Sequence, residues 1–531
     1  MTKRILISGI KLPFSADDGE FFREAKLRIK RAGLDSRDFS FRFHKRSLDA
    51  RKREQILYVC SVIAETDADI SVSEEKLKKI GASLIPSDEL EVRKGTEKLS
   101  ERPVIVGFGP AGIFCALLLA ENGYSPIVIE RGGSVAERTE LVGRFYESGQ
   151  LDVNTNIQFG AGGAGTFSDG KLVTRINDKN CSYVLRRFYE FGAPEEILYK
   201  AKPHIGTDIL RNIVLAAAKR IEALGGEIRY HTKLEKLSGH RLITSEGELE
   251  SAVTVLALGH SARDTYMMLA EQGFDLVPKP FSVGVRIEHL QTDIDRALFG
   301  ELAGDPRLGV GEYNLSDTTG ERGVYTFCMC PGGEVVAAAS EEGGVVVNGM
   351  SRFARDGKNA NSAVAVSVRT EDYGGTIEGA IAFQRELERN AFRAGGGDYS
   401  APVQTFGDFL AGKAVTEPRR VLPTYRNGNF CRIANLNDIL PAFVSENLKR
   451  GILSFDRRLR GFAAEDAVLS GVETRTSAPL RILRGEDMCA LLHDGVYPCG
   501  EGAGYAGGIT SAALDGMKVA MAIMRRYAPP E

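Results

Sequence analysis

One short stretch, Arg102–Gly112, constrains the fold of this chain more than any other. Residues 103–106 are apolar and mostly β-branched, as expected of a short buried parallel strand. Gly107, Gly109 and Gly112 follow in G-x-G-x-x-G spacing, where a strand would turn into a helix. Glycines at these positions permit a tight turn, close approach of backbone to a pyrophosphate, and close packing of helix on strand.

The residues that follow complete a nucleotide-binding unit. Pro110 fixes φ in the first helical turn, where its missing N–H costs nothing, and a helix is expected over 111–122. A second strand is expected over 126–129, and it ends in Glu130. That acid lies about 20 residues beyond the first glycine, where a carboxylate can accept a hydrogen bond from a ribose hydroxyl. The five features together predict an adenine dinucleotide site.

The length of the chain requires more than one core. With 531 residues, 43% hydrophobic and 26% charged, it has the composition of a multidomain globular protein. We expect an α/β protein with a discontinuous Rossmann-like ββα dinucleotide-binding domain. The expected segments are a small α+β domain (1–95), the first part of the dinucleotide-binding domain (96–280), an inserted mixed β-rich substrate domain (281–480), and the second part of the dinucleotide-binding domain (481–531).

Net charge and cysteine content bear on the binding partners of the protein and on its cellular compartment. The net charge of −3 gives no general case for binding nucleic acid or an anionic membrane. Eight scattered cysteines in so long a chain favour reduced thiols. The first residues lack the apolar core of a secretory signal, and no stretch approaches the length of a membrane span. We therefore expect a cytoplasmic protein that does not enter a membrane.

The first 95 residues contain a basic run, His44–Arg53, between two expected strands, 39–44 and 55–63. Such a run is typical either of a patch for nucleic acid or an acidic partner, or of a solvated turn. The turn is favoured because the run contains no aromatic residues on which bases could stack. A polar linker over 86–102 joins this unit to the nucleotide-binding fold.

A second glycine-rich stretch, residues 154–171, follows the first nucleotide-binding unit. Gly160, Gly162, Gly163 and Gly165 are separated only by alanines, which suits neither a stable helix nor a central strand. The stretch suits backbone that lies against a planar or anionic ligand, and the alternative is a mobile surface loop. Phe159, Phe167 and the low number of charges favour the ligand.

Two later segments return to the same pattern. Residues 254–259 form an apolar strand that runs into Gly259 and His260, as in the returning segment of a dinucleotide fold. Residues 495–520 read as strand, glycine loop and helix. A helix beginning near Gly508 would direct its free N–H groups at the ligand of that loop.

These segments together resemble the two-dinucleotide-binding-domain flavoproteins of the glutathione reductase type. The stretches Gly162–Lys171 and Gly500–Gly516 more closely resemble a family of uncharacterised bacterial FAD-dependent dehydrogenases, which carry a small N-terminal α/β domain. The resemblance extends over the whole chain and implies a non-covalent FAD. It also implies that Glu501 stands where relatives usually have Asp.

The resemblance implies a set of cofactor contacts distributed over these motifs. They are Gly107, Gly109, Pro110, Ala111, Gly112, Glu130, Arg131, Arg138, Gly163, Gly165, Thr166, Ser168, Gly170, Gly259, Gly500, Glu501, Gly508, Ile509 and Thr510. The positive end of the helix near Gly508 would then stabilise negative charge on the flavin.

Catalytic residues are less clearly marked. The candidates are Lys171, His260 and His289. We also expect His204 near the cofactor. Each of the four could instead have a purely structural role or lie at the surface. Cys328-Met-Cys330 is either a redox pair or two buried core cysteines on one face of a strand. Arg419-Arg420 and Arg457–Arg460 either hold an acidic substrate or are solvated. We expect no metal site.

The electron donor is constrained by what the sequence lacks. It has no second G-x-G-x-x-G after a strand and no C-x-x-C, so neither a nicotinamide domain nor a disulfide reductase is indicated. NADH or NADPH is expected only as a transient donor. We predict an FAD-dependent oxidoreductase of a small or medium organic substrate. The alternative is a flavin-dependent protein that modifies or binds RNA or protein and docks through residues 1–95.

Overall fold

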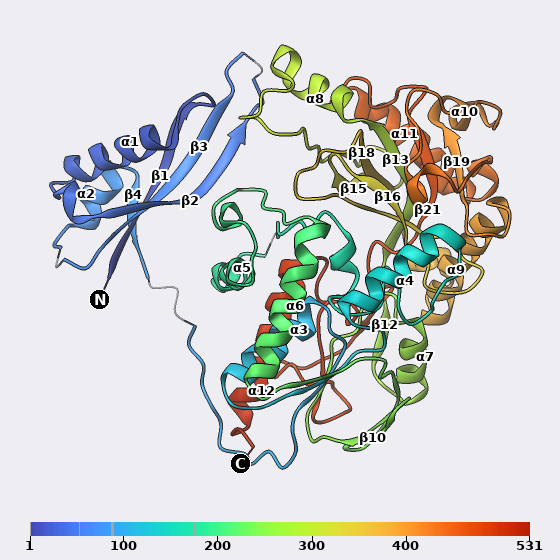
Figure 1. The fold of residues 1–531 in the computed structure, drawn as a ribbon, viewed down its shortest axis with the longest axis horizontal. Helices are drawn as coiled ribbons and strands as arrows, with labels where there is room; N and C mark the ends of the chain where they lie inside the picture. The colour runs from blue at the N-terminus through green and yellow to red at the C-terminus, as the bar shows by residue number, and fades with distance from the viewer. Residues whose placement is uncertain (1, 53, 69, 87–89, 175, 531) are drawn as a thin grey trace.

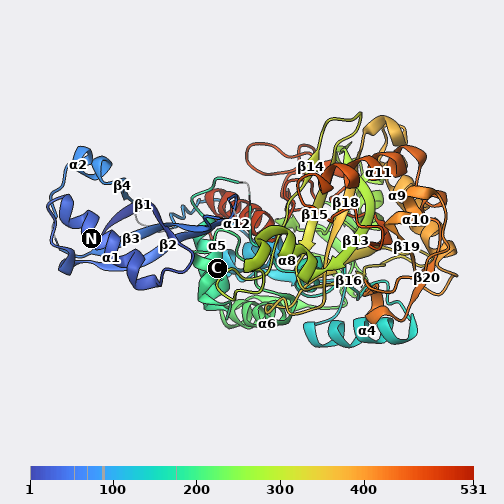
Figure 2. The same cartoon turned by 90° about the horizontal axis from the view of Figure 1, so that it is seen from above.

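A computed structural model describes residues 2–52, 54–68, 70–86, 90–174 and 176–530. It is a mixed α/β protein in which an N-terminal unit projects from one side of a larger body (Figures 1 and 2). Among the described residues, none of the helices combines the length and the apolar character needed to cross a bilayer.

The N-terminal unit is a four-stranded sheet in the order β2-β3-β1-β4 with two helices. Its elements are β1 (Lys3–Pro13), α1 (Asp18–Arg31), β2 (Ser40–Asp49), β3 (Leu57–Thr66), α2 (Glu74–Lys79) and β4 (Ala82–Ile85). The capping box of Asp17 and Glu20 starts α1, and the buried Phe21, Ala25 and Ile29 hold it on the sheet.

Only the part of the basic run after Asp49 lies in the connection that the sequence predicted. Residues 44–49 belong to β2, which continues because Lys45–Asp49 pair with Leu57–Ser61 of β3. Arg46 stacks 4.1 Å from the ring centroid of Tyr58 and pairs with Asp18 at 2.7 Å. Arg53, at the end of the run, lies outside the described residues.

A five-stranded, fully parallel sheet in the order β7-β6-β5-β11-β23 forms the centre of the body. Its strands are β5 (Val104–Val106), β6 (Ile127–Ile129), β7 (Glu227–Arg229), β11 (Thr254–Leu256) and β23 (Val496–Pro498). The last strand comes from the C-terminal part of the chain and pairs with β11. The sheet is therefore complete only when the C-terminal strand β23 has paired with β11.

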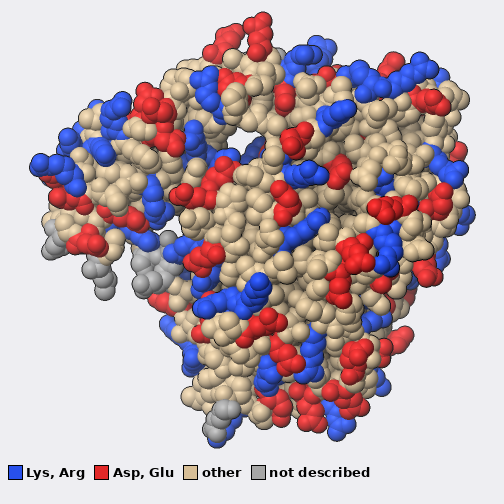
Figure 3. All heavy atoms as spheres, in the orientation of Figure 1, with Lys and Arg blue, Asp and Glu red and all other residues tan. Residues whose placement is uncertain are grey.

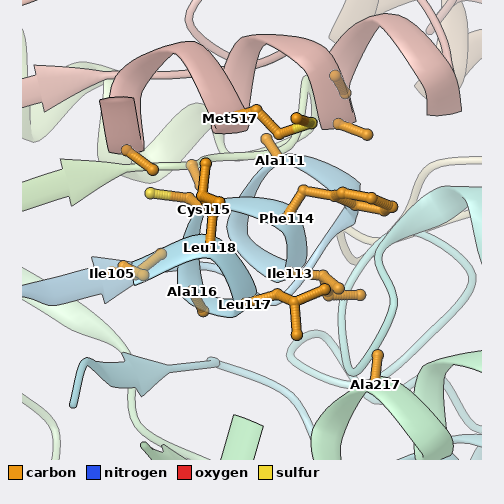
Figure 4. Close-up of a cluster of buried hydrophobic side chains, with 14 of the residues drawn as sticks. Ile105, Ala111, Ile113, Phe114, Cys115, Ala116, Leu117, Leu118, Ala217 and Met517 are labelled. Atoms are coloured by element: carbon orange, nitrogen blue, oxygen red, sulfur yellow. The ribbon is translucent and has the colours of Figure 1, made fainter. Parts of the chain in front are cut away.

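Helices cover one face of this sheet, where Ile105, Val128 and Val255 are buried. They include α3 (Pro110–Glu121), α5 (Cys181–Glu190), α6 (Thr207–Ala223) and α12 (Ile509–Arg526). Helix α3 is apolar on nearly every side, which suits its place between the sheet, α6 and α12 (Figure 4). Close packing of α3 on α12 needs Gly516, where a Cβ would lie 2.1 Å from the carbonyl oxygen of Ala111.

The other face of the sheet packs on smaller elements, which are β8 (Leu234–Ser238), β9 (Arg241–Thr244), β10 (Gly247–Glu250) and α7 (Arg263–Glu271). Residues 225–236 contain most of β7 and β8, which belong to different sheets. Helix α4 (Val135–Ser148) begins at the capping box of Ser134 and Glu137 and ends at Gly149.

The region from residue 281 to about 475 is rich in strands, as its sequence indicated. A seven-stranded sheet has the order β14-β15-β18-β13-β21-β19-β20. Its strands are β13 (Phe281–Leu290), β14 (Ser316–Asp317), β15 (Val324–Cys330), β18 (Asn359–Val368), β19 (Ala401–Thr405), β20 (Cys431–Ile433) and β21 (Val468–Glu473).

Further elements complete the β-rich region. They are β12 (Leu276–Pro278), α8 (Gln291–Phe299), β16 (Glu334–Ala337), β17 (Val347–Met350), α9 (Ile377–Ala394), α10 (Phe406–Ala411), α11 (Ala442–Asp456) and β22 (Leu480–Ile482). The hairpin of β16 and β17 joins the two halves of the body. Its Val335 packs into the β-rich core, and its Val336 packs beside Phe167 of the glycine-rich residues 154–170, which we call the glycine loop.

The N-terminal unit contacts both parts of the body. The backbone of Arg46 exchanges hydrogen bonds with Tyr199 (2.7 Å) and Ala201 (2.8 Å), which belong to the part of the body that contains the parallel sheet. The hydroxyl of Tyr58 donates to the carbonyl of Arg307 at 2.5 Å on the β-rich side. The β2–β3 hairpin thus bridges two segments more than 100 residues apart in the sequence.

Candidate functional site: two helix N-termini and a glycine loop

Two helices with uncapped N-termini begin against the glycine loop. Helix α3 follows Gly109 and helix α12 follows Gly508, and neither glycine can offer a side chain to the first helical turn. The first N–H groups of a helix need acceptors from outside the helix. Gly163 of the glycine loop faces Gly109, and Gly165 faces Ile509, so the unsatisfied donors of both helices border this loop and suit anionic groups there.

The three fingerprint glycines have different roles. At Gly107, with φ +104°, a Cβ would lie 2.5 Å from the carbonyl oxygen of Ala257. At Gly112 a Cβ would lie 2.0 Å from the carbonyl oxygen of Gly107. These two glycines are required by the packing of the protein itself.

Gly109 is different because its φ of −85° suits any residue. A Cβ there would meet only the Cα of Gly163, at 3.8 Å. Gly259, Gly507 and Gly508 likewise have no atom within 4 Å of the position of a Cβ. At Gly109, Gly507 and Gly508 the open space lies directly before a helix N-terminus, and Gly259 follows the end of β11.

Glu130 connects the fingerprint to the glycine loop. Its buried carboxylate accepts hydrogen bonds from the backbone N–H of Phe108 (2.9 Å), Gly132 (3.0 Å) and Gly160 (3.0 Å). An ionised carboxylate can accept about four hydrogen bonds, so one more acceptor position remains. The predicted ribose contact stays a prediction that this geometry allows.

Arg138 has a role that the sequence analysis did not foresee. It has no exposed surface, and it donates to the backbone carbonyls of Asn156, Ile157, Gly160, Ala161 and Gly163 at 2.7–3.3 Å. Burial lowers the pKa of its guanidinium to about 9. Arg138 was predicted to contact the cofactor, but it is placed beneath the glycine loop and holds it from inside.

Arg131 is partly buried and engaged by neighbouring side chains. Its guanidinium donates to both carboxylate oxygens of Asp264 (3.0 and 2.9 Å) and lies 4.2 Å from the ring centroid of Phe159. Burial opposes ionisation of Asp264, but its hydrogen bonds with Arg131 hold its pKa below the ordinary value. This pair fixes the position of the chain directly after Glu130.

The glycine loop contains a tight turn. Gly163, with φ +64°, faces Gly109, while Gly165 faces Ile509 at the start of α12. The hydroxyl of Ser168 donates to the carbonyl of Gly165 (2.6 Å) and accepts from the N–H of Gly170 (3.0 Å). The loop therefore lies against both helix N-termini, as a cofactor-binding loop should.

One buried hydroxyl of the loop has no partner among the described residues. Thr166 is 2% exposed, and its Oγ1 makes no hydrogen bond within the described structure. Its carbonyl is occupied, because it accepts from Thr207 Oγ1 at 2.8 Å.

The C-terminal segment is fixed to the same place. Gly500, with φ +77°, donates its N–H to Asp515 at 2.7 Å, and Asp515 also pairs with Arg484. Thr510 Oγ1 donates to the carbonyl of Leu172 at 2.8 Å, which ties the start of α12 to the end of the glycine loop. Burial raises the pKa of Glu501 to about 7, although Lys279 opposes this rise.

The candidate catalytic residues fall into different places. His260 is half-buried beside Gly259, and its Nδ1 lies 3.0 Å from Ser261 Oγ. Burial, with Arg475 and Arg263 nearby, lowers the pKa of His260 to about 3. At neutral pH this imidazole is uncharged and can act as a hydrogen-bond donor or acceptor.

Lys171 follows the glycine loop and belongs to a charged cluster. Its ammonium lies 2.8 Å from Asp169 and 3.8 Å from Glu312, and Arg355 pairs with both acids. Burial would raise the pKa of Glu312, but Lys171, Arg355 and Lys202 lower it to about 2.

His204 lies beside this cluster. Its Nε2 is 3.1 Å from the carbonyl of Phe353, and its ring stacks on Phe353. Burial lowers its pKa.

His289 does not belong to the site. It is 3% exposed at the end of β13, its Nε2 donates to the carbonyl of Phe462 at 2.8 Å, and its ring contacts that of Phe462. His289 was named as a catalytic candidate, and these contacts place its ring within the packing of the β-rich region. Arg420 is likewise engaged, in ion pairs with Asp466 and Asp293.

Cys328 and Cys330 do not share one face of a strand. A register shift between Phe327 and Cys330 breaks the alternation, and Cys328 adopts φ +43°. Cys328 is exposed and Cys330 is buried, although surrounding protein raises the pKa of the Cys328 thiol to about 12. The carbonyl of Cys328 accepts from Nη2 of the buried Arg286 at 2.7 Å.

Sequence reasoning missed two buried networks of charged residues. Arg286 Nε lies 3.1 Å from Glu473 Oε2, and a Cβ at Gly349 would occupy the place of this guanidinium. Arg263 and Arg475 both pair with Glu388. Their partners lie far apart in the chain, so no local spacing could reveal them.

The described residues contain no group of three or more His, Cys, Asp or Glu side chains that could hold a metal ion. Acidic and basic atoms are interspersed over the face of the molecule shown in Figure 3, including the N-terminal unit.

Comparison with known proteins identifies the family. Residues 280–476 match the family described as FAD-dependent protein, C-terminal domain-like. A protein of Clostridium beijerinckii, described as uncharacterized, is 46% identical over 548 aligned residues, which cover 99% of this chain and 100% of that protein. This chain belongs to the family of that clostridial protein. The match of residues 280–476 confirms the prediction that the cofactor is FAD.

More distant similarities were also found. A 103-residue segment is 29% identical to a subunit of the ferredoxin:CoB-CoM heterodisulfide reductase of Methanosarcina acetivorans and covers 19% of this chain and 12% of that protein. Glycine oxidase from Geobacillus kaustophilus is 13% identical with a TM-score of 0.33, covering 82% of this chain and 97% of that one. L-proline dehydrogenase from P. horikoshii is 13% identical with a TM-score of 0.33, covering 80% and 93%. Scores this low support no conclusion about the reaction.

Proposed function

We propose that this protein is an FAD-dependent oxidoreductase of a small or medium organic substrate. The observation that carries the proposal is the convergence of the uncapped N-termini of α3 and α12 with the glycine loop. The match to FAD-dependent proteins supports it. When bound, FAD supplies the hydride or electron transfer of such a reaction.

The residues of this site would bind and orient the cofactor. Backbone N–H groups after Gly109 and Gly508 would hold its anionic groups, and Glu130 would accept from its ribose. The positive end of α12 would favour negative charge on the ring placed there. The likeness to glutathione-reductase-type flavoproteins is part of this proposal.

His260 and Lys171 are the candidates for proton transfer or substrate orientation in this proposal. Both lie next to segments assigned to the cofactor; Lys171 is paired with Asp169, and the imidazole of His260 is uncharged at neutral pH. Glu501, with a pKa of about 7, is a third group that could hold or release a proton. The alternative of an RNA- or protein-docking flavoprotein has no further support, because Arg46 of the basic run is used within the fold.

The test uses Gly109→Ala, since Gly109 has an ordinary φ and free space around it. We expect the variant to fold like the parent and to lose the yellow colour, because the methyl group would occupy the place of the pyrophosphate. Gly143→Ala on the open face of α4, with no atom within 4 Å, is the matched control and should stay yellow. Absorbance spectra and chromatography of the nucleotide released on heating measure the result. A folded, colourless parent protein, or release of FMN, would overturn the proposal.

A further inference from the structure

A groove lies between α7 and α9, outside the proposed cofactor site. It encloses about 520 Å³, within the range of about 300–1,000 Å³ that is usual for small-molecule sites. Its lining consists of Met267, Glu378, Ile381, Ala382, Arg385, Glu386, Arg389 and Arg393.

Three arginines follow one another along this groove at every fourth residue of α9. Arg385, Arg389 and Arg393 therefore share one side of the helix, where like charges repel each other. Arg385 pairs with Glu341 at 2.8 Å, and Arg393 donates to the side chain of Asn390. Arg389 is exposed and forms no ion pair within the part of the chain that the structure describes. A ligand anion would supply the missing counter-charge.

The rest of the lining narrows the class of ligand. Met267, Ile381 and Ala382 provide an apolar wall, and Glu378 and Glu386 provide acceptors for hydroxyl donors. Three arginines and two glutamates leave one net positive charge. Such a lining suits a phosphate monoester with hydroxyl groups better than a bare inorganic anion.

The groove is connected to the proposed cofactor site by alternating charges. Arg385 shares Glu341 with Arg263, whose Nη1 lies 3.2 Å from that carboxylate. Arg263 in turn shares the buried Glu388 with Arg475. Arg263 is three residues after His260, which follows the open position at Gly259. An anion that attracts Arg385 away from Glu341 would change the charge balance along this series.

We propose that the groove binds a hydroxyl-bearing organic phosphate and that this ligand is coupled to the FAD site through Glu341, Arg263 and Glu388. The binding part stands apart from the proposed function, whereas the coupling part rests on it. Coupling of this kind is reciprocal, so the phosphate would also bind differently to protein with and without FAD.

The experiment titrates the FAD-loaded protein with AMP, glucose 6-phosphate and inorganic phosphate, using calorimetry for affinity and the visible spectrum for coupling. We expect at least one of the two esters to bind at least tenfold more tightly than inorganic phosphate. AMP and glucose 6-phosphate separate a nucleotide ligand from a sugar phosphate.

Variants locate the binding. Arg389→Ala and Arg393→Ala should each weaken ester binding at least tenfold, and Arg220→Ala, an exposed arginine of α6, should not. Glu341→Gln should preserve binding and abolish the spectral change. Absence of ester binding, equal binding of inorganic phosphate, or equal loss in Arg220→Ala would overturn the site. All these variants should remain yellow, so their failure is distinguishable from failure of the FAD assignment.

Discussion

Arg263 of α7 and Glu388 of α9 form a buried pair with two hydrogen bonds, of 2.9 and 2.7 Å. The first residue belongs to the nucleotide-binding region and the second to the β-rich region. Arg475 adds two more hydrogen bonds to the same carboxylate, at 3.1 and 3.0 Å. Burial would raise the pKa of Glu388, but the two arginines hold it far below the ordinary value. The two regions are thus joined by charge as well as by apolar contact.

Glu388→Gln should therefore destabilise the protein strongly. The change leaves the buried Arg475 without its counter-ion and Arg263 with Glu341 alone, and breaking a buried pair in this way costs about 3–5 kcal/mol. Urea unfolding monitored by fluorescence measures the loss. Glu386→Gln, an exposed change on the same helix, is the control for helix propensity and should alter the unfolding free energy by less than about 0.5 kcal/mol. Equal effects of the two changes would contradict the role given to Glu388.

Arg138→Gln should release the glycine loop from beneath. The variant loses charge-assisted hydrogen bonds to five carbonyls, each worth about 1.5–3 kcal/mol when a charged group donates. We expect a lower melting temperature and loss of FAD during purification. Arg144→Gln changes a half-exposed arginine six residues further along α4 and should do neither. Retention of full FAD content by Arg138→Gln would show that the loop does not need this support.

Glu473 should make stability depend on pH between its unfolded and folded pKa values. Burial raises the folded pKa to about 7 from the ordinary 4.5, even though Arg286 opposes the shift. The folded state then holds a proton that the unfolded state has lost, so this contribution is fully present below pH 4.5 and disappears as the pH rises through 7. Relative to the parent, Glu473→Gln should become more stable as the pH rises from 5 to 7.5.

Unfolding free energies of parent and variant at several pH values measure this difference. The exposed Glu465→Gln should show a constant difference from the parent. A difference for Glu473→Gln that moves in the opposite direction would mean that pairing with Arg286 favours the ionised carboxylate.

Nicotinamide should reduce the flavin only through transient contact. The five-stranded sheet is the single fully parallel sheet among the described strands, and its fingerprint is already assigned to FAD. We expect the stopped-flow reduction rate to rise nearly linearly with NADH or NADPH up to about 1 mM, the upper end of usual KM values. Saturation at micromolar concentration would require a nicotinamide site that this assignment lacks.

The local parts of the site could be predicted from the sequence. Gly107, Gly109, Gly112 and Glu130 have a fixed spacing because one strand, one turn and one helix position them. The structure separates their roles, since Gly112 is needed by the packing of α3 whereas Gly109 leaves open space. Spacing alone cannot make that distinction, because it contains no information on neighbouring atoms.

The parts that could not be predicted depend on tertiary pairing. The sequence analysis assumed that Cys328 and Cys330 point to the same face of a regular strand. A shift in strand register between Phe327 and Cys330 breaks this alternation of side chains. An arginine at position 138 is a residue type that commonly binds phosphate, but helix α4 directs its side chain towards the carbonyl groups of the glycine loop. In both cases the local secondary structure was predicted correctly, but the surroundings of the side chains were not.

The packing of α12 on α3 has a consequence during synthesis of the chain. Helix α3 is apolar on nearly every side, yet α12, which covers it, is made almost 400 residues later. At about 5–20 residues per second, the side of α3 that faces α12 stays uncovered for roughly 20–80 s of synthesis. The nascent chain must keep this surface from aggregating until its last segment emerges, and molecular chaperones that bind exposed apolar helices are suited to that interval.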